Sequence, residues 1–200
     1  DQPRSRGLGD VYKRQVLPIM RKLHLSAGGV LLLAALYFVL DVSEFVALLL
    51  AAAAHELGHL AAIALTGGRV VSITANVTGA VITRSTPRSR WHELFCDAAG
   101  PVVGVVWAGL ASGAGSAMNS DMLLISAGMS LALSVFNALP VLPLDGGRMF
   151  ECLFGRKAAA MVSLVAASAV LLLGVVLAAS DMGIALLAAG AVLMAGQARV

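Results

Sequence analysis

The stretch LLLAAAAHELGHLAAIALTG, residues 48–67, places two histidines and a glutamate inside a run that is otherwise soluble in lipid. An Asp, Lys or Arg at the centre of a membrane helix costs about 2.5–3.5 kcal/mol on insertion scales, and ionisable residues at that depth are functional by default. We therefore expect His55, Glu56 and His59 to serve a function at membrane depth.

The composition is that of a membrane protein. Hydrophobic residues make up 59% of the 200 residues, charged residues make up 12%, and the mean hydropathy is +0.90. Soluble domains average roughly 45–50% apolar and ~25% charged residues. The formal net charge is +3, but the basic residues lie at the ends of apolar runs, which favours a positive-inside membrane topology over nucleic-acid binding. We expect contact with the lipid bilayer and no nucleic acid partner.

Six stretches approach the ~20 mostly apolar residues that a transmembrane helix needs. They cover about residues 25–41, 44–66, 92–112, 121–139, 158–179 and 182–198. The connections near 41–44, 113–121 and 179–183 carry no Lys or Arg, whereas all ten basic residues after residue 15 fall on the other face of a six-helix arrangement. Basic loops stay cytoplasmic. We therefore expect a multi-pass protein of the bacterial cytoplasmic membrane with both termini inside.

Residues 69–84, RVVSITANVTGAVITR, depart from the helical pattern. They are rich in Val, Ile and Thr, with apolar residues at 71, 73, 75 and 77 and a turn signal at Thr78-Gly79. This alternation predicts a short β-hairpin or small sheet. It is either a surface hairpin at the cytoplasmic interface or an edge strand that pairs with an extended peptide. The predicted fold class is an all-α membrane protein of about six transmembrane helices, with this membrane-associated sheet after the second helix.

The first fifteen residues share no periodicity with the rest of the chain. Their segment DVYKRQ back-translates naturally to the transposon end used in sequencing libraries, so we interpret residues 1–15 as a sequencing artefact or a disordered N-terminus. We treat residues 16–200 as a single intramembrane domain without a CBS or PDZ domain.

The motif HELGH, residues 55–59, has the spacing of a metal site. His55 and His59 are at i and i+4, on one helical face and about 6 Å apart along the axis. Both imidazoles can reach one tetrahedral Zn²⁺, with Glu56 beside them as general base. Zinc lowers the pKa of a bound water to about 7, and Glu56 can take the proton and pass it to the leaving amine. The alternative is a buried polar network between helices without a metal.

A catalytic zinc needs a third protein ligand and an open position. Glu93 and Asp97 begin the third apolar stretch, where an acid is ordinarily a cap or a dipole partner. Asp145 stands out instead, in FNALPVLPLDGGRMFE, residues 136–151. The alternative for this carboxylate is an ion pair with Arg148 in an interfacial loop. Other candidates lie on the non-basic side or at helix starts: Asp41, Glu44, Asp121, Asp181, His24 and His92.

The backbone around Asp145 is expected to be irregular. Pro140 and Pro143 lack a backbone donor and should stop the fourth helix near Asn137. Gly146 and Gly147 permit a tight or left-handed backbone. Irregular backbone at membrane depth is tolerated only where protein buries it or where it lines a watery cavity. The sequence therefore predicts a polar inlet beside Asp145.

HELGH in a membrane helix, followed about 80 residues later by NALPVLPLDGGR, resembles the site-2 protease family of intramembrane zinc metalloproteases. The likeness covers about residues 25–160. Within the family, the compact six-helix arrangement is similar to that of the stage IV sporulation proteases, which process a pro-sigma factor. The resemblance implies one Zn²⁺ held by His55, His59 and Asp145, with Glu56 as the catalytic acid/base. It implies a substrate-contacting or oxyanion-supporting role for Asn137.

The resemblance implies a transmembrane or membrane-associated protein substrate, docked on the edge of the sheet at 69–84, and membrane-protein inhibitors or regulators as further partners. The sporulation proteases usually carry a CBS domain after the sixth helix, which this sequence does not show, so the pro-sigma assignment is the least supported part. Two other functions stay open. One is a catalytically silent relative that binds membrane proteins, and the other is a zinc transporter.

Overall fold

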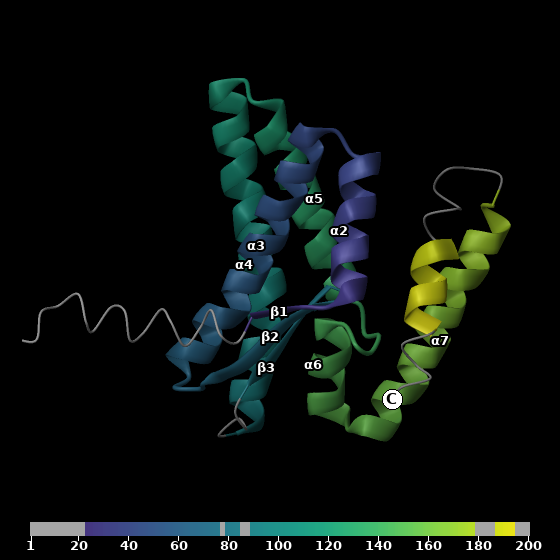
Figure 1. Cartoon of the computed structure of the whole chain (residues 1–200). Helices are drawn as coiled ribbons and strands as arrows, with labels where there is room; N and C mark the ends of the chain where they lie inside the picture. Colours follow the sequence, from purple (N-terminus) through teal and green to yellow (C-terminus); the bar gives the residue numbers. More distant parts are fainter. Residues whose placement is uncertain (1–22, 77–78, 85–88, 179–186, 195–200) are drawn as a thin grey trace, which may run out of the picture.

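The computed structural model describes residues 23–76, 79–84, 89–178 and 187–194, so residues 1–15 lie outside the described part. Its elements are β1 (Leu23–Leu25), α2 (Ala27–Val39), α3 (Val42–Leu65), β2 (Val70–Asn76), β3 (Gly79–Arg84), α4 (Arg90–Met118), α5 (Asp121–Asn137), α6 (Asp145–Phe154) and α7 (Arg156–Val176). Residues 187–194 form a further helical segment. Figure 1 shows α2 to α5 side by side above the sheet, with α7 and residues 187–194 set to one side and joined to them through α6.

The helices bury small side chains and expose large ones. Ala51 on α3, Ala111 on α4 and Ser130 on α5 are at most 2% exposed. Phe38 is 87% exposed and Val165 is 70% exposed. Helices in lipid gain nothing from hiding large apolar side chains from water, so their contacts are made by small residues that allow close approach. The distribution is that of a protein surrounded by lipid.

Close packing and hydroxyl groups hold α4 against α5. Ser130 donates to the carbonyl of Gly104 at 2.8 Å, and the Trp107 indole donates to Ser126 at 3.0 Å. A Cβ built on Gly104 would lie 2.2 Å from the Ser134 hydroxyl oxygen, so a side chain there would turn that hydroxyl away from the Ser130 carbonyl to which it donates. Such polar contacts between membrane helices are worth about 0.6–2 kcal/mol each.

Three of the described helices are long and apolar enough to cross a membrane: α3, α4 and α7. The apolar helices α2 and α5 are shorter, with 13 and 17 residues. At 1.5 Å per residue they extend about 20 Å and 26 Å, against roughly 30 Å of hydrocarbon. The membrane location is supported, while the count of six spans stays a prediction, and its last span, 182–198, is only partly described.

The hairpin predicted over 69–84 is confirmed as β2 and β3, which pair antiparallel with Ile73 opposite Ile82. The predicted turn residue Thr78 lies outside the described residues. The sequence did not predict β1, which runs parallel to β2 and makes the order β1-β2-β3. A three-residue strand is too short to show an alternation. The Ser26 backbone N–H donates to the Ala75 carbonyl at 3.0 Å, so α2 begins directly at the sheet.

The two ends of the molecule differ in charge. Figure 1 shows the α2–α3 and α4–α5 connections at the upper end, and the sheet, α6 and the starts of α4 and α7 at the lower end. These lower elements carry the basic residues Arg84, Arg90, Arg148, Arg156 and Lys157. The helices therefore alternate in direction as the charge pattern predicts.

The segment after α5 corrects one expectation. The fourth helix ends at Asn137 as predicted, but Gly146 and Gly147 do not form a tight or left-handed turn. They lie in the first turn of α6. A Cβ on Gly146 would lie 2.2 Å from the Ala138 carbonyl oxygen, and one on Gly147 would lie 2.4 Å from the Val141 carbonyl carbon. The glycines are there because the backbone folds back against α6, which sets Asp145 at the helix start.

Candidate metal centre

His55 and His59 project from the same face of α3 toward α4 and α6. Both lie on a continuous helix of 24 residues, so the i, i+4 spacing predicted from HELGH is realised. Gly58 lets α4 approach this turn, because a Cβ there would lie 2.5 Å from the Ala99 carbonyl oxygen. The His55 side chain is 5% exposed, and the His59 side chain is 11% exposed.

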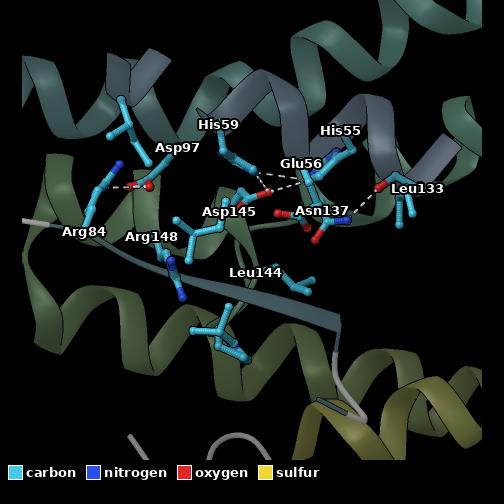
Figure 2. A pocket seen from close by; sticks show the side chains of 15 residues that line it. His55, Glu56, His59, Arg84, Asp97, Leu133, Asn137, Leu144, Asp145 and Arg148 are labelled. Carbon is cyan, nitrogen blue, oxygen red and sulfur yellow. Dashed lines mark hydrogen bonds and ion pairs between the residues drawn. The ribbon is translucent and has the colours of Figure 1, made fainter. Parts of the chain in front are cut away.

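Asp145 joins the two histidines from the start of α6, which lies 90 residues along the chain from His55. Its Oδ2 is 3.1 Å from His55 Nε2 and 3.2 Å from His59 Nε2. The two Nε2 atoms are 3.3 Å apart. Figure 2 shows the three side chains pointing at one another. The alternative pairing of Asp145 with Arg148 is not observed, because within the described residues the carboxylate pairs with the histidines.

The three atoms have the chemistry and spacing of a zinc site. Two imidazole nitrogens and one carboxylate oxygen are a known catalytic zinc ligand set. Ligands about 2.0–2.1 Å from a tetrahedral ion lie roughly 3.3 Å from one another, and the observed separations are 3.1, 3.2 and 3.3 Å. These residues fit a metal ion.

The charge of Asp145 suits a ligand. Burial by itself raises the pKa of this carboxyl group, but the neighbouring His55 and His59 imidazoles outweigh burial and lower the pKa to about 2. Asp145 is therefore ionised at neutral pH, as ligation of a cation requires.

Glu56 lies beside these three residues, with one carboxylate oxygen unpartnered. Its Oε2 is buried and has no hydrogen-bond partner among the described residues. A buried carboxylate oxygen without a hydrogen-bond partner is costly. The position of Glu56 Oε2 in this cavity therefore indicates that the oxygen accepts a hydrogen bond from a molecule bound there. Glu56 is therefore placed to exchange a proton with a water molecule in the cavity.

A cavity of about 240 Å³ holds this cluster. Leu133, Asn137, Val81 and Ile82 line it together with the ligand set. The Nδ2 of Asn137 donates to the Leu133 carbonyl at 3.0 Å. An amide nitrogen has two N–H groups, so the second can donate to a substrate.

The comparisons with known proteins bear on this arrangement. The solved site-2 protease from Methanocaldococcus jannaschii matches with a TM-score of 0.68 at 20% identity, over 88% of this chain and 89% of that chain. The fold is site-2 protease-like. A family model described as Peptidase family M50 matches residues 113–180, which include Asn137 and Asp145. No match to a curated protein sequence was found.

The site-2 protease-like fold also brings together two residues that the sequence did not pair. Arg84, at the end of β3, donates to Asp97 of α4 at 2.9 Å. Asp97 is 4% exposed, and the helix begins seven residues earlier at Arg90. The expectation that Asp97 caps the helix is therefore wrong: it is an ion-pair partner that ties the sheet to the bundle. No local signal marks this pair, because Arg84 follows a hairpin whose docking is decided by tertiary packing.

Arg84→Ala is expected to lower the free energy of unfolding by about 3–5 kcal/mol, because it leaves the Asp97 charge buried without its partner. The double variant Arg84→Ala/Asp97→Ala should recover part of that loss. Denaturant titration in mild detergent measures both. Arg90→Ala, at the exposed start of α4, is the control, and an Arg84→Ala as stable as this control would contradict the prediction.

Proposed function

We propose that this protein is an intramembrane zinc metalloendopeptidase of the site-2 protease type. The observation that carries the proposal is the convergence of His55, His59 and Asp145 next to Glu56 inside an apolar helix bundle. The M50 family match and the site-2 protease-like fold support the same chemistry.

Each site residue has a distinct role in this proposal. His55, His59 and Asp145 hold one Zn²⁺. Zinc, when bound, supplies a Lewis acid that activates water and polarises a carbonyl group. Glu56 takes a proton from the attacking water and delivers it to the nitrogen of the leaving amine, which completes hydrolysis. Asn137 donates a hydrogen bond to the oxygen of the scissile carbonyl group, where negative charge develops.

The substrate in this proposal is a transmembrane or membrane-associated protein whose helix unwinds near the site. β1 pairs with one edge of β2, and β3 pairs with the other, so β3 has one edge without a strand among the described residues. Val81 and Ile82 of that strand line the cavity. An extended peptide can add to such an edge through main-chain hydrogen bonds. We therefore propose β3 as the docking strand.

The lower end of the bundle in Figure 1 is proposed to face the cytoplasm, because the basic residues gather in its elements. Both termini then lie inside a bacterial cell, and the peptide bond is cut near the cytoplasmic leaflet. Pro-sigma factor processing in sporulation is the narrower proposal, and membrane-protein regulators would accompany it. It rests on the motif resemblance alone.

The other two functions have weaker support. A silent relative has no need of Glu56, whose side chain lines the same cavity as the ligand set and has one buried carboxylate oxygen without a partner among the described residues. A transporter needs polar residues along a path. In the described part of the chain, α7 carries its charged residues at its start, and the polar side chains beyond them are two serines that hydrogen-bond to backbone groups.

Metal removal tests the proposal. The purified chain is expected to hold about one zinc per molecule and to cleave a reconstituted single-span substrate. Chelation should abolish cleavage, and added Zn²⁺ should restore it, because the ligand set binds one ion. Metal analysis and gel-based cleavage assays measure this. Cleavage that survives complete chelation contradicts a metalloprotease, and zinc binding without cleavage of any candidate substrate favours the silent relative or the transporter.

A further inference from the structure

One turn of α4 forms a slot for the imidazole of His59. The Cys96 carbonyl oxygen lies 2.8 Å from His59 Nδ1. A carbonyl oxygen can only accept, so Nδ1 carries the hydrogen and donates it. The lone pair of Nε2 is then directed at the ligand cluster, 3.2 Å from Asp145 Oδ2. A hydrogen bond to the second ring nitrogen is how proteins fix the tautomer and orientation of a metal-binding histidine.

Gly100 forms the other side of this slot, one helical turn beyond Cys96. A Cβ built on Gly100 would lie 2.2 Å from Nε2, 2.5 Å from Cε1 and 2.8 Å from Cδ2 of His59. These three ring atoms are the nearest neighbours of that Cβ. Non-bonded atoms do not approach so closely, so any side chain at position 100 displaces the ring.

A glycine at position 100 is unfavourable for helix stability, because it lies inside α4. Glycine inside a helix is about 1 kcal/mol worse than alanine, and a glycine there usually has a packing or functional reason. Gly109 lies on the same helix, and a Cβ there would meet nothing within 4 Å. Gly58 differs from both, because its Cβ would meet the backbone of α4 at Ala99. A side chain at position 100 meets a movable ring instead of backbone.

We infer that Gly100 is a positioning residue for the metal ligand His59. It admits the imidazole to the slot, and the Cys96 carbonyl group holds the ring with Nε2 toward the ligand cluster. A methyl group at position 100 pushes the ring out of that place and leaves the helices where they are. This inference rests on the proposed metal centre and adds a residue that contacts a ligand without being one.

The test compares Gly100→Ala with Gly109→Ala in the full chain, purified in detergent. Competition with a chromophoric chelator measures zinc affinity, and the visible absorption of bound Co²⁺ reports the ligand geometry. Gly100→Ala is expected to bind zinc about 10–100-fold more weakly, as for losses of residues that orient metal ligands, and to change the Co²⁺ spectrum. Its thermal unfolding midpoint should not fall below the wild-type value. Gly109→Ala should match wild type in zinc affinity and Co²⁺ spectrum, with a thermal midpoint at or above the wild-type value because alanine favours the helix.

The outcomes separate this inference from the proposed function. If wild type binds zinc and Gly100→Ala binds it equally well with the same Co²⁺ spectrum, the positioning role is overturned and the metal centre stands. If wild type binds neither ion, the metal centre fails, and the role of Gly100 fails with it.

A second comparison applies if the Gly100→Ala protein does not accumulate in the cell as folded material. His59→Ala removes the ring that the new methyl group would meet. Gly100→Ala/His59→Ala should therefore accumulate and unfold at the same temperature as His59→Ala alone. A double variant that still fails to accumulate overturns the inference.

Discussion

Glu56→Gln is expected to lower the rate of peptide cleavage by at least about 10²–10⁴-fold, the contribution of a general acid–base group. Glutamine keeps the size and shape of glutamate but cannot accept the proton from water or return it to the amine. Since Glu56 is not among the three converging ligand atoms, the variant should still hold about one zinc per chain. Cleavage of a co-expressed single-span substrate and metal analysis of the purified chain measure the two effects separately.

Glu44→Gln is the matched control. Glu44 lies on the same helix, in its first turn, where it accepts from the Asp41 backbone N–H at 3.1 Å. Glutamine can accept the same hydrogen bond, so cleavage should stay at the wild-type rate. Equal activity of Glu56→Gln and wild type, at equal zinc content, would end the protease proposal and favour a zinc-dependent binding or transport protein. Full loss of cleavage would also provide a trapped form for identifying substrates.

Asp145→Ala should remove both zinc and activity. Its carboxylate supplies the only oxygen of the ligand set, and the remaining two imidazoles lose the anion that draws them together. We expect zinc affinity to fall by at least about 100-fold, since even residues that only support a ligand cost 10–100-fold when they are lost. Cleavage should fall to background at zinc concentrations that saturate wild type. Chelator competition and the cleavage assay provide the measurements.

Asp121→Ala provides the comparison for this second variant. Asp121 is the first residue of α5, exposed, and outside the cavity that holds the cluster. It should leave zinc binding and cleavage unchanged. An Asp145→Ala variant with wild-type zinc affinity would show that Asp145 is not a ligand, and the third ligand would then have to be sought elsewhere in the chain. Loss of zinc from Asp145→Ala with retained helical content would support the ligand role.

Together these variants divide the site by function. Glu56→Gln is expected to remove proton transfer and leave zinc binding intact. Asp145→Ala is expected to abolish zinc binding and, with it, cleavage. Gly100→Ala is expected to weaken zinc binding by displacing the His59 ring, which itself remains. Three different combinations of zinc content and cleavage are therefore expected from residues that lie in one cavity or against it.

Within one element, the sequence determined the geometry directly. The two histidines share a face because a helix repeats every 3.6 residues, and the structure keeps them on one continuous helix. The fourth helix ends at Asn137 before Pro140, as the missing donor of proline requires. The alternation over 69–84 gave a hairpin in its predicted place. These features depend on residues that are close together along the chain.

Only the tertiary structure decided which distant residues meet. Asp145 reaches the histidines across 90 residues because Gly146 and Gly147 let α6 pack against the preceding backbone. Likewise Arg84 meets Asp97, and Gly100 borders His59, through the docking of the sheet and of α4. Such contacts depend on how whole elements pack, and packing is set by shape and close contact between surfaces that no local periodicity encodes. Local spacing along the chain thus set the two histidines on one face, and the fold completed the site by bringing Asp145 to them.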